Sequence, residues 1–221
     1  MTDVPIAALF TRADGTYRFA RWGRPIVPVV FGVEDATLAS VKGAVEAVVV
    51  LAGHKMAEID PELGVNLMVF FFRDWAELRA VRDLDKLVPD LAALCQRLEA
   101  AAANQYRLFR FDAAGAIKAV FVFVRMDAAL SDMPAEQLAL AQAVQMICQW
   151  SDQAFAGTSP LAQVGGRVIL RPDIAAVIRA AYDPVMPAVA TDPSHALRLA
   201  ARIERGGYPQ GGRQSLRPDA L

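Results

Sequence analysis

The polar side chains between residues 142 and 152 are the clearest candidates for chemistry in this chain. Four of them recur at spacings of three, four and three: Gln142, Gln145, Gln149 and Asp152. On an α-helix these spacings align side chains along one face, so we predict a polar stripe. The stripe is interpreted as a polar groove that binds a ligand or partner or, as is more common for an amphipathic helix, as a solvated face. It would lie opposite an apolar face of Leu140, Val144, Ile147, Ser151 and Ala154.

Residue counts argue against a zinc-peptidase helix in this segment. Such a helix needs two histidines one turn apart and a glutamate that activates water. The chain has two histidines, His54 and His195, on distant segments, whereas Gln145 and Gln149 occupy the four-residue spacing. Glutamine is a poor zinc ligand, so we expect no metal ion at this segment. We expect no other cofactor, because phosphate-binding and dinucleotide-binding glycine motifs are absent from the sequence.

Nucleophilic catalysis has one candidate, Cys148, with His54 or His195 as the base, or with Asp152, which is nearby in sequence. No glycine-rich elbow surrounds Cys148, and a cysteine within a helix is more often a small core residue. We therefore expect a buried thiol, and whether it meets Cys95 stays open. Of the histidines, His54 follows a helix end at Gly53 and His195 starts the last helix, where we expect it to be exposed.

Hydrophobic periodicity predicts helices over residues 34–53, 74–84, 89–105, 133–155, 171–183 and 192–207. Residues 16–32 suggest two short strands or one bent edge strand, and 55–60 a further short strand. The continuous apolar run at 64–72 suggests a strand covered on both faces. "YRLFRFD" and "AIKAVFVFVR" flank the turn residues Asp112 and Gly115, which predicts a β-hairpin. "QVGGRVIL" at 163–170 is interpreted as a turn, with an anion site as its alternative.

These elements predict one α+β domain over residues 1–205. Its small mixed or antiparallel sheet would contain the hairpin and pack against several helices. Residues 206–221, rich in glycine, proline and polar groups, are expected to form a flexible C-terminal tail.

Composition limits the compartment and the partners. The longest apolar stretches are about ten residues or fewer, whereas a membrane span needs about 20, so we expect no membrane association. The N-terminus lacks the basic start and long apolar core of a secretory signal, so we expect the cytoplasm. With a net charge of −1 and dispersed arginines, nucleic-acid binding is not expected.

Four stretches resemble a bacterial family, domain of unknown function 2927. They are "FARWGRPIVPVVFG", "LAGHKMAEIDPELGVNLMVFF", "IKAVFVFVR" and "AAYDPVMPAVATDPSHALRLAARI". The resemblance implies a zincin-like, metallopeptidase-like fold. Where that family shows a cysteine, a carboxylate pair and "QALG", this chain has "CQWSDQAFAG", which places Gln149 and Trp150 at the carboxylate positions. Neither can act as a general base, so the resemblance implies a former site helix without the groups for hydrolysis.

The favoured hypothesis is a non-catalytic, metallopeptidase-like scaffold, a pseudoenzyme that acts through a protein partner or a homodimer. The alternatives are a hydrolase that uses Cys148 and Asp152, or a protein that binds small molecules.

Overall fold

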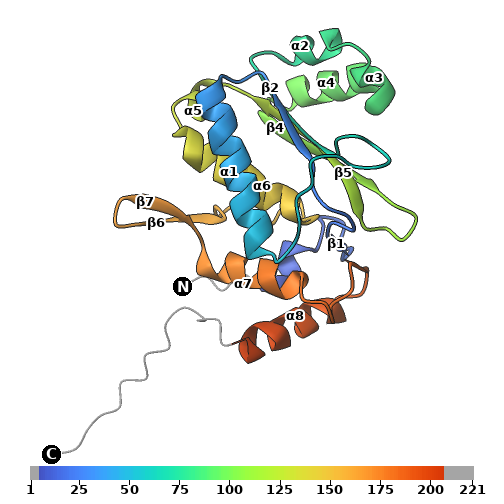
Figure 1. Ribbon diagram of the computed structural model, residues 1–221, viewed down its shortest axis with the longest axis vertical. Helices are drawn as coiled ribbons and strands as arrows, with labels where there is room; N and C mark the ends of the chain where they lie inside the picture. Colours follow the sequence, from blue (N-terminus) through green and yellow to red (C-terminus); the bar gives the residue numbers. More distant parts are fainter. Residues whose placement is uncertain (1–4, 207–221) are drawn as a thin grey trace, which may run out of the picture.

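The computed structural model describes residues 5–206, and its centre is a four-stranded mixed sheet (Figure 1). The strand order is β2 (Pro28–Phe31), β3 (Leu67–Phe72), β5 (Ile117–Arg125) and β4 (Gln105–Phe111). The first three run parallel, while β4 runs antiparallel to β5 at the edge. The predicted α+β class is confirmed.

Helices cover both faces of this sheet. α1 (Asp35–Leu51) and α6 (Ala135–Ile147) pack against one face, and α2 (Trp75–Ala80), α3 (Leu84–Leu87) and α4 (Leu91–Ala100) against the other. β3 explains the arrangement, because successive side chains of a strand point to opposite faces. Val69 belongs to one buried cluster and Phe70 to the other, so the strand predicted to be covered on both faces is confirmed.

The two cysteines belong to these separate clusters. Cys148 lies in the cluster on the α1–α6 side, whereas Cys95 lies in the cluster on the α4 side. Both are free and buried, which answers the question left open by the sequence: the two thiols do not meet.

The predicted hairpin is β4–β5, closed by Asp112 and by Gly115 with a φ of 86°. The Asp112 carboxylate accepts hydrogen bonds from the N–H groups of Ala114 and Ala116, both at 2.9 Å. This local bonding explains why a short polar turn between two apolar runs was readable from sequence.

Most of the remaining elements lie below α1 and α6 (Figure 1). η1 (Ile6–Leu9), α7 (Pro172–Ala181), α8 (Ser194–Arg205) and the small β1–β8 sheet (Phe19–Ala20, Val189–Ala190) gather at the end of the sheet. α5 (Ala128–Ser131) precedes α6. β6 (Leu161–Val164) and β7 (Arg167–Leu170) form a projecting hairpin (Figure 1).

Several predictions of single elements were wrong. Residues 55–60 form no strand, since they contain only two isolated bridges, Met56 to Ile26 and Asp60 to Gly64. The helix predicted over 74–84 ends at Ala80, and that predicted over 133–155 ends at Ile147. "QVGGRVIL" contains the predicted glycine turn, but its flanking residues are strands. The tail predicted from residue 206 lies, apart from Gly206, outside the described residues. Among the described helices, none is long and apolar enough to cross a membrane.

Candidate functional site

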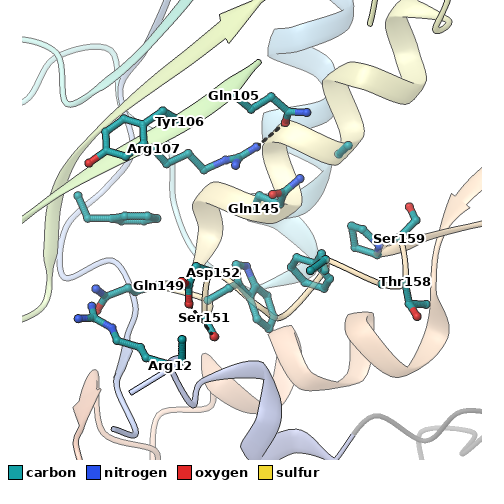
Figure 2. A pocket seen from close by; sticks show the side chains of 18 of the residues that line it. Arg12, Gln105, Tyr106, Arg107, Gln145, Gln149, Ser151, Asp152, Thr158 and Ser159 are labelled. Carbon is teal, nitrogen blue, oxygen red and sulfur yellow. Dashed lines mark hydrogen bonds between the residues drawn. The ribbon is translucent and has the colours of Figure 1, made fainter. Parts of the chain in front are cut away.

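A cleft of about 1030 Å³ opens beside the edge strand β4 and the last turns of α6 (Figure 2). β4 supplies one wall through Gln105, Tyr106, Arg107 and Phe109. Ala141 and Gln145 from α6 form part of the lining, residues 149–160 contribute most of the rest, and residues 12–14 complete it. The cleft therefore joins three stretches that are far apart in sequence: residues 12–14, β4, and the end of α6 with the segment that follows it.

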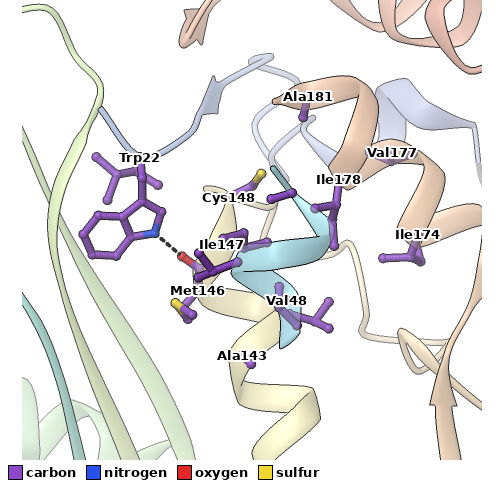
Figure 3. Packing of buried hydrophobic residues seen from close by; sticks show 14 of the residues in the cluster. Trp22, Val48, Ala143, Met146, Ile147, Cys148, Ile174, Val177, Ile178 and Ala181 are labelled. Carbon is purple, nitrogen blue, oxygen red and sulfur yellow. Dashed lines mark hydrogen bonds between the residues drawn. The ribbon is translucent and has the colours of Figure 1, made fainter. Parts of the chain in front are cut away.

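The end of α6 decides which side chains reach this cleft. The last carbonyls of a helix have no partner within it, and here aromatic side chains bond three of them. Trp150 Nε1 donates to Val144 at 2.8 Å, Trp22 Nε1 to Met146 at 2.9 Å, and the Tyr182 hydroxyl to Ile147 at 2.7 Å. Figure 3 shows the Trp22 bond at the side of the packed core residues. With these carbonyls satisfied, the chain leaves the helix.

Beyond Ile147 the backbone is extended. Cys148 has φ −134° and ψ 160° and forms an antiparallel bridge with Arg21. The predicted single helical stripe is therefore wrong, because Gln149 and Asp152 lie outside the helix. The structure nevertheless places Gln145, Gln149 and Asp152 on the cleft wall.

Gln142 lies behind the wall rather than on it. Its side chain is buried, at 3% exposure, so a solvated face is wrong for this residue. Its amide oxygen accepts from Arg107 Nη2 at 2.6 Å, and its amide nitrogen donates to Gln105 Oε1 at 2.8 Å. Arg107 Nη2 also donates to Gln105 Oε1 at 3.0 Å, which closes a three-residue polar network. Ser151, predicted on the apolar face, is buried and donates from Oγ to the Thr11 carbonyl at 2.7 Å.

The outer edge of β4 offers free main-chain groups. Arg125 N–H donates to the Asn104 carbonyl at 2.8 Å, which marks these two residues as a hydrogen-bonded pair. Hydrogen-bonded and non-hydrogen-bonded pairs alternate along antiparallel strands. In the observed register, the N–H and C=O groups of Gln105, Arg107 and Phe109 therefore point away from β5. Their N–H groups make no hydrogen bond to any residue between 5 and 206.

Aromatic rings form the apolar part of the lining. Trp150 stacks on Phe10 with ring centroids 5.1 Å apart, and Phe155 packs edge-on against it at 5.3 Å. The indole N–H of Trp150 donates to the Val144 carbonyl. This hydrogen bond and the packing of the two rings together fix the orientation of the indole. Trp150 stands where the resemblance placed a carboxylate, so this position presents an apolar surface to the cleft.

The candidate nucleophile is remote from the cleft surface. Cys148 has 0% exposure, and burial raises the pKa of its thiol well above the usual range. Asp152, its proposed partner in a hydrolase, is exposed on the cleft wall. A buried thiol of raised pKa is a poor nucleophile, because the thiolate is the reactive form.

Both histidines make hydrogen-bond contacts with other groups of the protein and lie away from the cleft lining. His195, predicted to be exposed, is fully buried, and its Nδ1 lies 2.8 Å from the Tyr17 hydroxyl. Burial lowers its pKa to about 4. His54 Nε2 contacts the Arg24 carbonyl at 2.8 Å, and burial lowers its pKa as well. Within residues 5–206, no cluster of three or more His, Cys, Asp or Glu side chains could hold a metal ion.

Sequence reasoning missed Arg107 and Gln105. The signal was present in "QYRLFRF", where Arg107 shares the strand face of Phe109, and Phe109 packs against the core. A charged residue on the core-facing parity of a strand is unusual and indicates a specific polar environment.

Comparisons with known proteins found no relative of this chain. No protein-family model matches the chain, and searches of curated proteins and of solved structures found no similar protein.

Proposed function

We propose that this protein is a non-catalytic binding scaffold whose partner is another protein, and that an extended segment of the partner lies in the cleft along β4. The free edge carries this proposal, because the outward N–H groups of Gln105, Arg107 and Phe109 have no hydrogen bond within the described residues. An exposed strand edge pairs readily with an extended peptide through main-chain hydrogen bonds.

The chemistry of the lining supports a peptide occupant. Gln145 and Gln149 can each donate to and accept from a peptide group, and Trp150 and Phe155 offer apolar surface for side chains. Main-chain pairing along β4 would give affinity, and these side chains would select among sequences.

The proposal includes the absence of catalysis by the groups first considered. Cys148 is buried with a raised pKa, and the cleft presents Gln149 and Trp150 where the resembled family has carboxylates. Neither side chain can take up a proton in a hydrolytic step.

The zincin-like scaffold and the cytoplasmic location are further parts of the proposal. The scaffold is supported by the four stretches of sequence that resemble family 2927. The location is supported by two cysteines that are both free thiols, the state that a reducing compartment maintains.

The test is selection of peptides from a random displayed library on the wild-type protein, followed by binding measurements on two variants. Ala141→Trp fills the cleft from α6, where Ala141 is part of the lining. Ala93→Trp adds the same ring at an exposed position of α4, on the opposite side of the sheet, and is the matched control.

The proposal predicts that selected peptides bind the wild type and Ala93→Trp alike and lose affinity for Ala141→Trp. Peptides that bind all three proteins equally, or a library that yields no binder, would contradict it. N-methylation of the peptide at alternate residues adds a second criterion. It should abolish binding in one register and be tolerated in the other, because only every second amide faces β4.

A second candidate, a small-molecule-binding protein, is favoured by the size of the cleft. Its volume of about 1030 Å³ lies at the upper end of typical ligand pockets. A thermal-shift screen with a metabolite library separates the two candidates. A ligand that stabilises the wild type but not Ala141→Trp, in a protein that selects no peptide, would favour this second function.

A further inference from the structure

The guanidinium of Arg107 is a charge held inside the cleft wall without a carboxylate partner. It forms no ion pair with any acidic side chain between residues 5 and 206. Its hydrogen bonds to side chains go from Nη2 to the amide oxygens of Gln105 and Gln142. Neutral amides compensate a desolvated cation less well than a carboxylate does, because they bring no opposite charge.

The rest of the guanidinium is left unpartnered. Arg107 Nε is buried and has no hydrogen-bond partner, and Nη1 makes no hydrogen bond to a described residue. A buried donor without a partner is unfavourable, so these groups point to a missing acceptor. Burial also lowers the pKa of Arg107 to about 10, which is the response of a cation that lacks both water and a counter-charge.

We propose that Arg107 anchors a carboxylate of the ligand that occupies this cleft. The inference deepens the proposed function and rests on it: the partner's segment would present an acidic group at the Arg107 position of β4. This acidic group is the carboxylate of an Asp or Glu side chain or of a chain terminus, since a planar carboxylate matches the geometry of a guanidinium.

The charge of the lining favours a monoanion over a phosphate. The charged residues of the cleft are two arginines and two aspartates, Arg12 and Arg107 against Asp14 and Asp152. Both arginines are half-buried, and of the two only Arg107 has a buried nitrogen without a hydrogen-bond partner. The four charges of the lining sum to zero, so one bound carboxylate leaves the smaller excess of negative charge and a doubly charged phosphate the larger one.

Gln142 acts as a positioning residue for this anchor. Its buried amide fixes Nη2 from behind, through the 2.6 Å bond, and is itself fixed by Gln105. Two of the three residues lie on β4 and one on α6, so the guanidinium is held between two rigid elements. A preorganised donor loses little side-chain entropy when its acceptor binds.

The experiment follows the side-chain Nε–H resonance of Arg107 in the full-length wild-type protein by NMR, with assignment from Arg107→Gln. Sodium acetate is the probe, with sodium chloride at equal ionic strength and neutral acetamide as controls. We expect a saturable shift with acetate alone. Removing a charged hydrogen bond worth about 1.5–3 kcal/mol predicts about 10- to 100-fold weaker acetate binding in Arg107→Gln. Arg110→Gln is the control on the other face of β4, where Arg110 bonds the Leu87 carbonyl.

Two further probes assign the source of the carboxylate. N-acetylalanine carries a terminal carboxylate, and the α-amide of N-acetylaspartate carries only a side-chain carboxylate. The probe that binds more tightly identifies the source of the carboxylate. Phosphate that saturates more tightly than every carboxylate would overturn the inference. So would an Arg107 resonance that responds to acetate no more than to chloride.

Failure of the anchor and failure of the proposed function give different results. If neutral, amidated peptides bind along β4 and Arg107→Gln binds them equally well, the peptide site stands and the anchor is wrong. If acetate binds at Arg107 but the cleft selects no peptide, the anchor stands and the ligand is a small acid.

Discussion

The hydroxyl of Tyr182 joins two backbone segments that both border the end of α6. It donates to the carbonyl of Ile147, the last residue of α6, at 2.7 Å, and accepts the N–H of Trp22 at 3.2 Å. All three residues are buried. Tyr182, the C-terminal cap residue of α7, is therefore one of the three donors that end α6 and so expose side chains of residues 149–152 to the cleft.

Tyr182→Phe tests this control of the helix end. The substitution removes one oxygen and leaves a buried carbonyl and a buried N–H without their partner, so we expect a loss of about 1–3 kcal/mol in unfolding free energy. Urea denaturation measures it. Tyr106→Phe is the control, because the Tyr106 hydroxyl makes no hydrogen bond to a described residue. Equal stability of the two variants would contradict the capping role.

Two glycines with opposite surroundings test the packing of β2 on β3. Gly32 has a φ of +81°, and a Cβ there would lie 1.9 Å from the Phe71 carbonyl oxygen. Gly32→Ala should therefore destabilise the protein by more than about 2 kcal/mol. Gly43 lies within α1 with open space around it, so Gly43→Ala should stabilise the protein by about 0.5–1 kcal/mol. Thermal unfolding of both variants decides; a harmless Gly32→Ala would count against this register.

The stability of the protein should fall as pH drops from about 6.5 to about 4 because of His195. Burial lowers the pKa of His195 to about 4 from 6.5, so the unfolded chain binds a proton in this window and the folded protein does not. The contribution is complete above pH 6.5 and is lost on acidification, up to about 3 kcal/mol. His195→Gln should flatten that part of the pH–stability curve measured by urea denaturation. An unchanged slope would show that other groups cause it.

Both thiols should resist modification in the native protein. Cys95 and Cys148 are 1% and 0% exposed, and burial raises the pKa of each. We expect a thiol reagent to label neither within the mixing time and to label both after denaturation. Fast native labelling in wild type and Cys95→Ser, lost in Cys148→Ser, would revive the hydrolase alternative.

The sequence predicted what depends on local pattern. The hairpin was readable because Asp112 and Gly115 form a turn with their own neighbours. The covered strand β3 was readable from its unbroken apolar run. The length of α6 was not, because the donors that end it include Trp22 and Tyr182, which lie far from the helix in sequence.

The candidate site was predicted in part for the same reason. Gln145, Gln149 and Asp152 reach the cleft, though not as one helical stripe. Gln142 was expected on the same stripe, but its side chain is buried and hydrogen-bonded to Arg107 and Gln105 of β4. A polar contact across 35 residues of sequence leaves no periodic signal in either segment.

Amide hydrogen exchange along β4, with and without a selected peptide, tests whether the partner's segment pairs with this edge. We expect the outward N–H groups of Gln105, Arg107 and Phe109 to become protected when the peptide binds. Those of Tyr106 and Leu108, already bonded to β5 in this register, should change little. A peptide that binds tightly yet leaves the three outward amides exchanging as before would contradict pairing along this edge.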